Sequence, residues 1–94
     1  MEITIRLTKV LSAMNNGEKE ACYSLVTGCD MAGLIDILDK DMSGIKTTLL
    51  DNNSDIADSI NIYVNGENIR YLQGTGTILS DGDQISIIPA AAAG

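Results

Sequence analysis

The group with the most distinctive chemistry in this chain is expected at its C-terminal end, where small residues lead to a glycine carboxylate. Pro89 closes an apolar strand sequence, and it is followed by Ala90, Ala91, Ala92, Ala93 and Gly94. Four alanines are too few to form a helix in water, and none has a side-chain group that anchors the segment. We therefore expect residues 90–94 to be a thin, mobile arm that ends in an unhindered carboxylate.

Other reactive side chains are sparse, because the chain has no histidine and so lacks the commonest general base and metal ligand. Asp51, Asn53 and Asp55 match the first ligand positions of a calcium loop. However, Ile56 and Ile62 stand where such a loop needs glycine and glutamate. We expect no metal site, no bound cofactor and no catalytic activity of the chain's own.

The two cysteines, Cys22 and Cys29, fit no common zinc-binding spacing. We interpret both as small buried hydrophobic residues, because a disulfide is disfavoured in a reducing cytosol. A reactive thiol is the alternative, chiefly for Cys29, which comes just before a predicted helix.

The charge balance is strongly acidic, with 13 Asp and Glu against 6 Lys and Arg and a net charge of −7. Nucleic-acid binding is disfavoured, because it depends on lysines and arginines that neutralise phosphates. An acidic domain suits a basic docking surface on a protein partner. No apolar run approaches the ~20 residues of a membrane span, and residues 1–6 do not read as a signal peptide. We expect a cytoplasmic protein that does not bind membranes.

Hydrophobic periodicity predicts two strands and a helix in the first half. Residues 3–7 alternate as a half-buried strand, 12–19 form a loop, and 21–26 return antiparallel to the first strand. Asp30 is a good N-cap, and Gly44 is expected to end the helix, with a further short turn over 45–50. The expected apolar stripe of the helix is Met31, Leu34, Ile35, Leu38 and Met42.

The sequence pattern in the second half of the chain predicts three more strands. Residues 60–64 alternate, Asn65-Gly66 is a strong hairpin signal, and 67–71 are expected to return as a fourth strand. A turn at 80–83 leads into the last strand, in which Ile85 and Ile87 face the core. The predicted fold is α+β: a mixed sheet of about five strands on one main helix, with the first and last strands side by side in its centre. Residues 1–89 form this domain.

Two stretches, Val64-Asn65-Gly66-Glu67-Asn68-Ile69-Arg70 and Leu79-Ser80-Asp81-Gly82-Asp83-Gln84-Ile85-Ser86-Ile87-Ile88-Pro89, carry a family resemblance. Together with the small-residue C-terminus, they resemble the ubiquitin-like sulfur carriers of the β-grasp fold. That family includes the small subunit of molybdopterin synthase, the thiazole-pathway carrier, and the carriers of cysteine and homocysteine synthesis. Molybdopterin-type and cysteine-biosynthesis-type members are the most similar.

The resemblance implies that the chain is a cosubstrate. An E1-like adenylating enzyme would use ATP to convert the Gly94 carboxylate to an acyl adenylate, and a sulfur donor would displace AMP to leave a thiocarboxylate. A synthase subunit would then accept the sulfur. Family members typically end in Gly-Gly, whereas this chain ends in Ala93-Gly94.

Docking candidates are Ile88, Tyr63 and Arg70, which we expect on the exposed sheet face near the tail. Two alternatives stay open. The chain could instead be a protein modifier conjugated through the same terminus, or an interaction domain with an inert tail. The sequence leaves the sulfur acceptor open between a pterin precursor and an activated serine or homoserine.

Overall fold

The computed structural model of this chain describes residues 1–90. Its strands are β1 (Glu2–Leu7), β2 (Glu20–Ser24), β3 (Ile60–Val64), β4 (Glu67–Asn68) and β5 (Gln84–Pro89). Its α-helices are α1 (Lys9–Ser12), α2 (Met31–Asp41) and α3 (Ile45–Leu49). Three 3-10 turns complete it: η1 (Ala13–Asn15), η2 (Ile69–Tyr71) and η3 (Gly74–Gly76).

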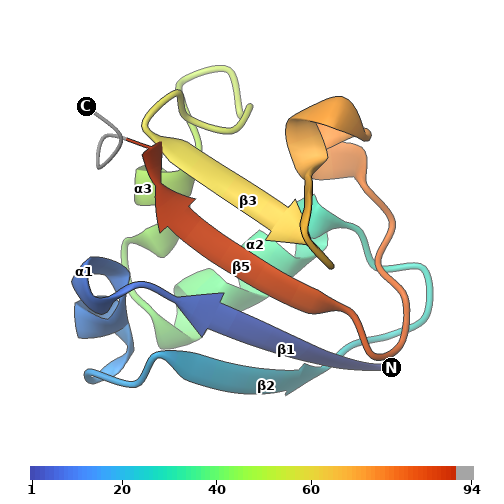
Figure 1. Cartoon of the computed structure of the whole chain (residues 1–94), viewed down its shortest axis with the longest axis horizontal. Coiled ribbons are helices and arrows are strands. Elements are labelled where there is room, and N and C mark those ends of the chain that lie inside the picture. The colour runs from blue at the N-terminus through green and yellow to red at the C-terminus, as the bar shows by residue number, and fades with distance from the viewer. Residues whose placement is uncertain (91–94) are drawn as a thin grey trace.

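The five strands form one mixed sheet in the order β2-β1-β5-β3-β4 (Figure 1). β1 and β5 are parallel neighbours, with Ile5 opposite Ile85. β5 pairs antiparallel with β3 on its other side, and β1 pairs antiparallel with β2. The predicted central pairing of the first and last strands is therefore confirmed.

One face of the sheet is covered by α2, which Figure 1 shows crossing behind the strands. Asp30 caps this helix by accepting a hydrogen bond from the Gly33 amide at 2.9 Å, as predicted. All five residues of the predicted apolar stripe are buried, with exposures of 1% or less. They pack against alternate residues of the strands, such as Ile5, Ile62 and Ile85, so the core is a single layer between helix and sheet.

Three local predictions are wrong. The first half of the predicted 12–19 loop is helical, because Leu11 is buried and draws the chain after β1 into α1 and η1. The fourth strand has only two residues, since burial of Ile69 bends the chain into η2. Gly44 does not end α2: the helix stops at Asp41, and Gly44, with φ 90°, precedes α3 instead. Within residues 1–90, no helix has the length and apolar character needed to span a membrane.

Candidate functional site

The root of the C-terminal arm is fixed at one end of the sheet. Pro89 is the last residue of β5 and lies opposite Ile60 of β3. Ala90 follows it, and its amide donates a hydrogen bond of 2.7 Å to the carbonyl of Ser59. The carboxylate predicted to react, on Gly94, and the predicted arm residues Ala91, Ala92 and Ala93 lie outside the described residues. The structure thus defines the point from which the arm departs.

The sheet face turned away from α2 carries two of the three predicted docking residues. Along β5 the buried side chains alternate with outward-facing ones, and Ile88 is one of the latter, 39% exposed. Tyr63 of β3 is half-buried and has the same orientation as Asn61, the residue opposite Ile88. Ile88 and Tyr63 therefore share this face, which we call the open face.

A shallow cavity of about 170 Å³ lies on the open face beside the root of the arm. It is formed where the ends of β1 and β5 run side by side, and Ile88 contributes to its wall. Its lining residues are Arg6, Leu7, Thr8, Ser86, Ile87 and Ile88. One of these lining residues, Ile88, stands two positions before Ala90 in the chain, so the cavity lies near the root of the arm.

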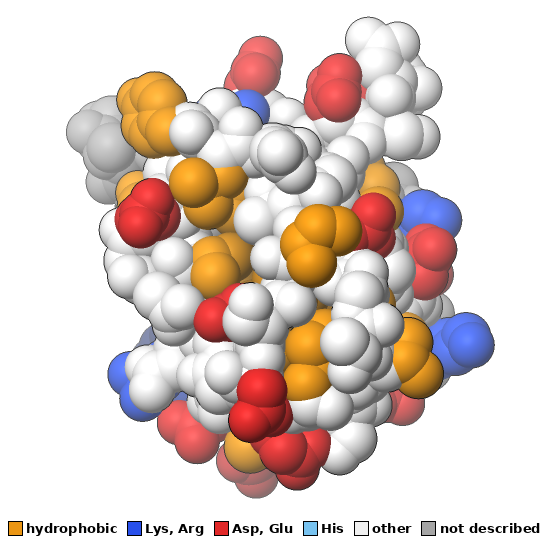
Figure 2. Space-filling view, turned by 90° about the vertical axis from the view of Figure 1, so that its right-hand side faces the viewer, with side chains coloured by type: hydrophobic (Ala, Val, Ile, Leu, Met, Phe, Trp, Pro, Cys, Tyr) orange, Lys and Arg blue, Asp and Glu red, His pale blue; other side chains and the backbone are white. Residues whose placement is uncertain are grey.

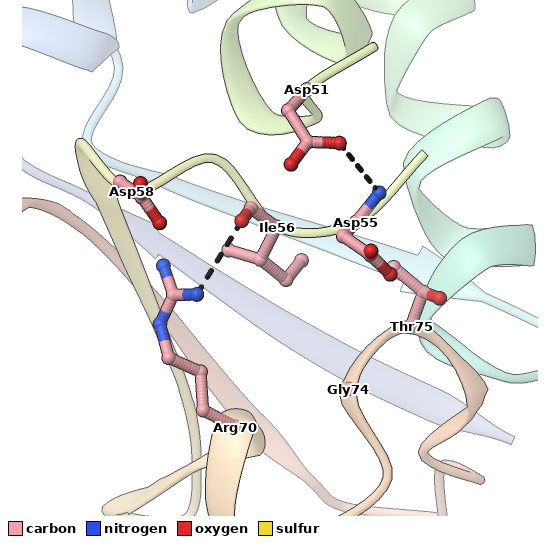
Figure 3. A pocket seen from close by; sticks show the side chains of 7 residues that line it. All are labelled: Asp51, Asp55, Ile56, Asp58, Arg70, Gly74 and Thr75. Carbon is pink, nitrogen blue, oxygen red and sulfur yellow. Dashed lines mark hydrogen bonds between the residues drawn. The ribbon is translucent and has the colours of Figure 1, made fainter. Parts of the chain in front are cut away.

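The third predicted docking residue, Arg70, has a different environment. Its guanidinium donates hydrogen bonds to the backbone carbonyls of Ile60 (2.6 Å), Ala57 (2.7 Å) and Ile56 (3.4 Å). In Figure 3 the guanidinium points from η2 toward the Ile56 carbonyl. Although Arg70 is exposed, its guanidinium donates to the protein's own backbone.

The cavity beside Arg70 has a volume of about 410 Å³ and is lined mainly by the loop before β3. Its walls are Asp51, Asp55, Ile56, Asp58, Arg70, Gly74 and Thr75. The Asp51 carboxylate is turned toward its own loop, where it accepts hydrogen bonds from the amides of Asn53 and Asp55. This Asx turn explains the polar sequence that resembles a calcium loop.

The two cysteines differ: Cys22 lacks the buried environment predicted for it, whereas Cys29 packs partly buried against the core. Cys22 is exposed on edge strand β2, because it occupies an outward-facing position of that strand. Cys29 is half-buried, and burial, together with the negative charge of Asp30, raises the pKa of its thiol. A raised pKa disfavours the thiolate at neutral pH, so this site does not favour a reactive thiol.

Hydrophobic side chains are also exposed away from the open face. They include Val26, Tyr71, Leu72 and Ile78. Figure 2 shows the end of the molecule that lies at the right of Figure 1, where hydrophobic side chains form several small groups separated by polar and acidic ones. Such scattered groups are normal for a protein surface and do not define a second site.

The contribution of Ser59 could not be predicted from the sequence. This residue binds the arm through its backbone carbonyl, so its side chain gives no signal in the sequence. The hydrogen bonds of Arg70 to the backbone carbonyls of its own chain could not be predicted from the sequence, and its docking role stays a prediction.

A family profile and a curated relative of this chain both indicate a family of sulfur carriers. The profile of the ThiS family matches residues 23–94. The sulfur carrier protein CysO of Mycobacterium tuberculosis is 33% identical over 96 residues, which cover 100% of both chains.

Solved structures agree with this assignment. The chain resembles a chain of the BexX/CysO complex of Amycolatopsis orientalis, with a TM-score of 0.84, 30% identity, and coverage of 98% of this chain and 99% of that chain. It also resembles the small archaeal modifier protein 1 of Methanosarcina acetivorans, with a TM-score of 0.78, 30% identity, and coverage of 99% and 96%. The predicted β-grasp, ubiquitin-like fold is confirmed.

Proposed function

Because this chain belongs to the ThiS family of ubiquitin-like sulfur carriers, we propose that it carries sulfur as a thiocarboxylate on Gly94. The observation that carries the proposal is the match to a sulfur carrier protein over the full length of both chains. The position of the arm supports it, since the root of the arm lies at the end of a central strand, beside the exposed hydrophobic side chain of Ile88.

The proposed activation takes place in two steps on a partner enzyme. The Gly94 carboxylate attacks the α-phosphate of ATP, pyrophosphate leaves, and an acyl adenylate forms. Sulfide, as HS⁻, then attacks the carbonyl carbon and AMP leaves, so that a C–S bond replaces the C–O bond to AMP and loss of the S–H proton gives the thiocarboxylate. Glycine suits this attack because it has no Cβ beside the reacting carbonyl. This chain supplies the carboxylate and its placement, and the partner supplies ATP and any general base.

The short arm requires the partner to bind close to its root. Four residues beyond Ala90 extend at most about 14 Å, because an extended residue spans at most ~3.6 Å. An enzyme that acts on Gly94 must therefore contact the domain around the end of β5. Ile88, Tyr63 and the neighbouring cavity of the open face are the proposed contacts.

The proposed partners are an E1-like adenylating enzyme and a sulfur-accepting synthase subunit. The structure of the Amycolatopsis CysO relative in complex with BexX supports the expectation that this chain acts by docking with another protein. The net charge of −7 would speed association with a basic partner surface. The candidate acceptors are a pterin precursor and an activated serine or homoserine, each tested with its own synthase.

Protein conjugation is the second candidate function, favoured by the 30% identity to the modifier protein of Methanosarcina acetivorans. Both functions begin with the same adenylate and differ in the nucleophile, which is a lysine amine in conjugation and sulfur in the carrier reaction. Isopeptide-linked adducts of this chain in cell extract would favour conjugation.

The experiment is to incubate the purified chain with ATP, sulfide and an E1-like adenylating enzyme, and to measure the intact mass. The expected gain is that of replacing one carboxylate oxygen with sulfur, and a chain lacking Gly94 serves as the control. No gain in mass, with an enzyme that is active on another carrier, would contradict the proposal.

A further inference from the structure

The carbonyl that holds the root of the arm lies in a tight turn over residues 57–60. The Ile60 amide donates to the Ala57 carbonyl at 3.0 Å, which closes the turn just before β3. Ser59 occupies the turn, and its carbonyl accepts the Ala90 amide at 2.7 Å. The direction in which the chain leaves β5 therefore depends on the position of this turn.

Arg70 holds both ends of the turn. One guanidinium nitrogen, Nη2, donates to the carbonyls of Ala57 and Ile60, the first and last residues of the turn. A second nitrogen, Nη1, donates to Ile56, the residue just before it, as Figure 3 shows. One side chain thus binds three backbone carbonyls, two before Ser59 and one directly after it.

The chemistry of this contact requires an arginine. A guanidinium is planar and presents its donors in a fixed fork, whereas a lysine ammonium is a compact charge on a flexible stem. Arg70 is itself placed by η2, where the Asn68 side chain accepts the Arg70 amide at 2.9 Å and buried Ile69 anchors the turn to the core. The guanidinium is therefore presented from a fixed base.

We propose that Arg70 is a positioning residue for sulfur loading, acting through the turn over 57–60 to set the exit direction of the arm. The inference rests on the proposed function. Loss of the guanidinium would let the turn and the root of the arm sample more directions, and only some of these suit entry into the active site of the adenylating enzyme. The apparent affinity of a protein falls in proportion to its binding-competent fraction, so KM should rise while kcat is kept.

The first measurement is the hydrogen-exchange rate of the Ala90 amide by NMR, in the wild-type chain and in Arg70→Gln. We expect exchange in the variant to be about ten-fold faster or more at Ala90, with core amides of β1 unchanged. Arg70→Lys should give an intermediate rate. Unchanged protection of Ala90 in Arg70→Gln would overturn the proposed coupling.

The second measurement is adenylation kinetics with an E1-like enzyme that activates the wild-type chain. Arg70→Gln should raise the KM for the carrier roughly three- to ten-fold with kcat unchanged. Lys19→Gln is the matched control, since it removes one exposed positive charge from the loop before β2 and should leave KM unchanged. An equal rise in KM for Lys19→Gln would assign the effect to charge and overturn the proposal.

Ala90→Pro tests the same link from the other side if Arg70→Gln fails to fold. It removes the amide that donates to Ser59 and leaves the guanidinium in place. Ala90→Pro should raise KM to a similar extent, and combining it with Arg70→Lys should give less than the product of the two effects. Unchanged KM in Ala90→Pro would contradict the inference. A wild-type chain that no adenylating enzyme activates would instead contradict the proposed function.

Discussion

The side-chain amide of Asn65 donates a hydrogen bond of 2.8 Å to the carboxylate of Asp83, although the two residues lie in separate turns. The second carboxylate oxygen of Asp83 accepts the Ser80 amide at 2.7 Å, and the Asn65 side-chain oxygen accepts the Gln84 amide at 2.9 Å. The β3–β4 hairpin and the turn before β5 are thereby joined into one unit at the start of the strand that carries the arm.

Asp83→Ala should lower the free energy of unfolding by about 2–4 kcal/mol, because it removes two hydrogen bonds that a buried carboxylate accepts. Urea denaturation measures this loss. Asp81→Ala is the matched control, since exposed Asp81 accepts one backbone amide, that of Glu2. Its cost should be about 1 kcal/mol. Equal costs for the two variants would contradict the structural role of Asp83.

Tyr23 should make the stability sensitive to alkaline pH. Burial, and then its hydrogen bond and charge interaction with Asp41, raise the pKa of Tyr23 from 10.0 to about 12. Between these values the unfolded chain has released the proton and the folded chain retains it, so the free energy of unfolding falls as the pH rises from about 10 to about 12. Below pH 10 this contribution is fully present.

Tyr23→Phe isolates the effect, because Lys46, whose pKa is raised by its hydrogen bond to Asp36, also loses stabilising protonation at high pH. We expect the wild-type chain to lose stability more steeply above pH 10 than Tyr23→Phe. Denaturant melts at a series of pH values check this, and identical slopes would show that the phenol is not involved.

Ile88→Ser should weaken binding of the adenylating enzyme about ten-fold while leaving the fold intact, because a half-exposed side chain at a docking site is lost. Isothermal titration calorimetry measures the Kd. Val26→Ser is the matched control: Val26 is 79% exposed, and it follows β2 outside the open face. Equal weakening by both substitutions would argue against docking on the open face.

Ala93→Gly should increase kcat/KM for adenylation by about two- to ten-fold, because it removes a methyl group next to the reacting residue and allows closer approach of the enzyme. Competition between the two chains for a limiting amount of adenylating enzyme gives the ratio directly. A slower Ala93→Gly chain would mean that the partner of this carrier has adapted to the alanine.

The layers of the fold could be predicted because their patterns are local and regular. Strict alternation in β1 and β5 marked both as half-buried strands, and the spacing from Met31 to Met42 defined the helix face that covers them. Asn65-Gly66 indicated a hairpin, and both residues have positive φ, of 52° and 88°. Here local preference and tertiary packing agree.

The remaining features depend on contacts that no local pattern encodes. Leu11 is buried by packing beyond the end of β1, and the first half of the loop predicted over 12–19 is instead the end of α1 followed by η1. Free cysteines are usually buried, which predicts a core position for Cys22. Instead, its position in edge strand β2 exposes its side chain to solvent. The docking role of Ile88 and Tyr63 stays a prediction. The hydrogen bonds of Arg70 could not be predicted, because they depend on how η2 lies against the loop before β3.

The central position of β5 also determines when the sheet is complete during folding. Among residues 1–90, β1 and β3 do not pair with each other and each pairs with β5, so the sheet is incomplete until the last strand of the domain is in place. Closing a sheet with strands so distant in sequence is a late step in folding. The same strand ends at Pro89 and presents the arm. The strand that completes the sheet is thus the same strand that ends at the root of the arm.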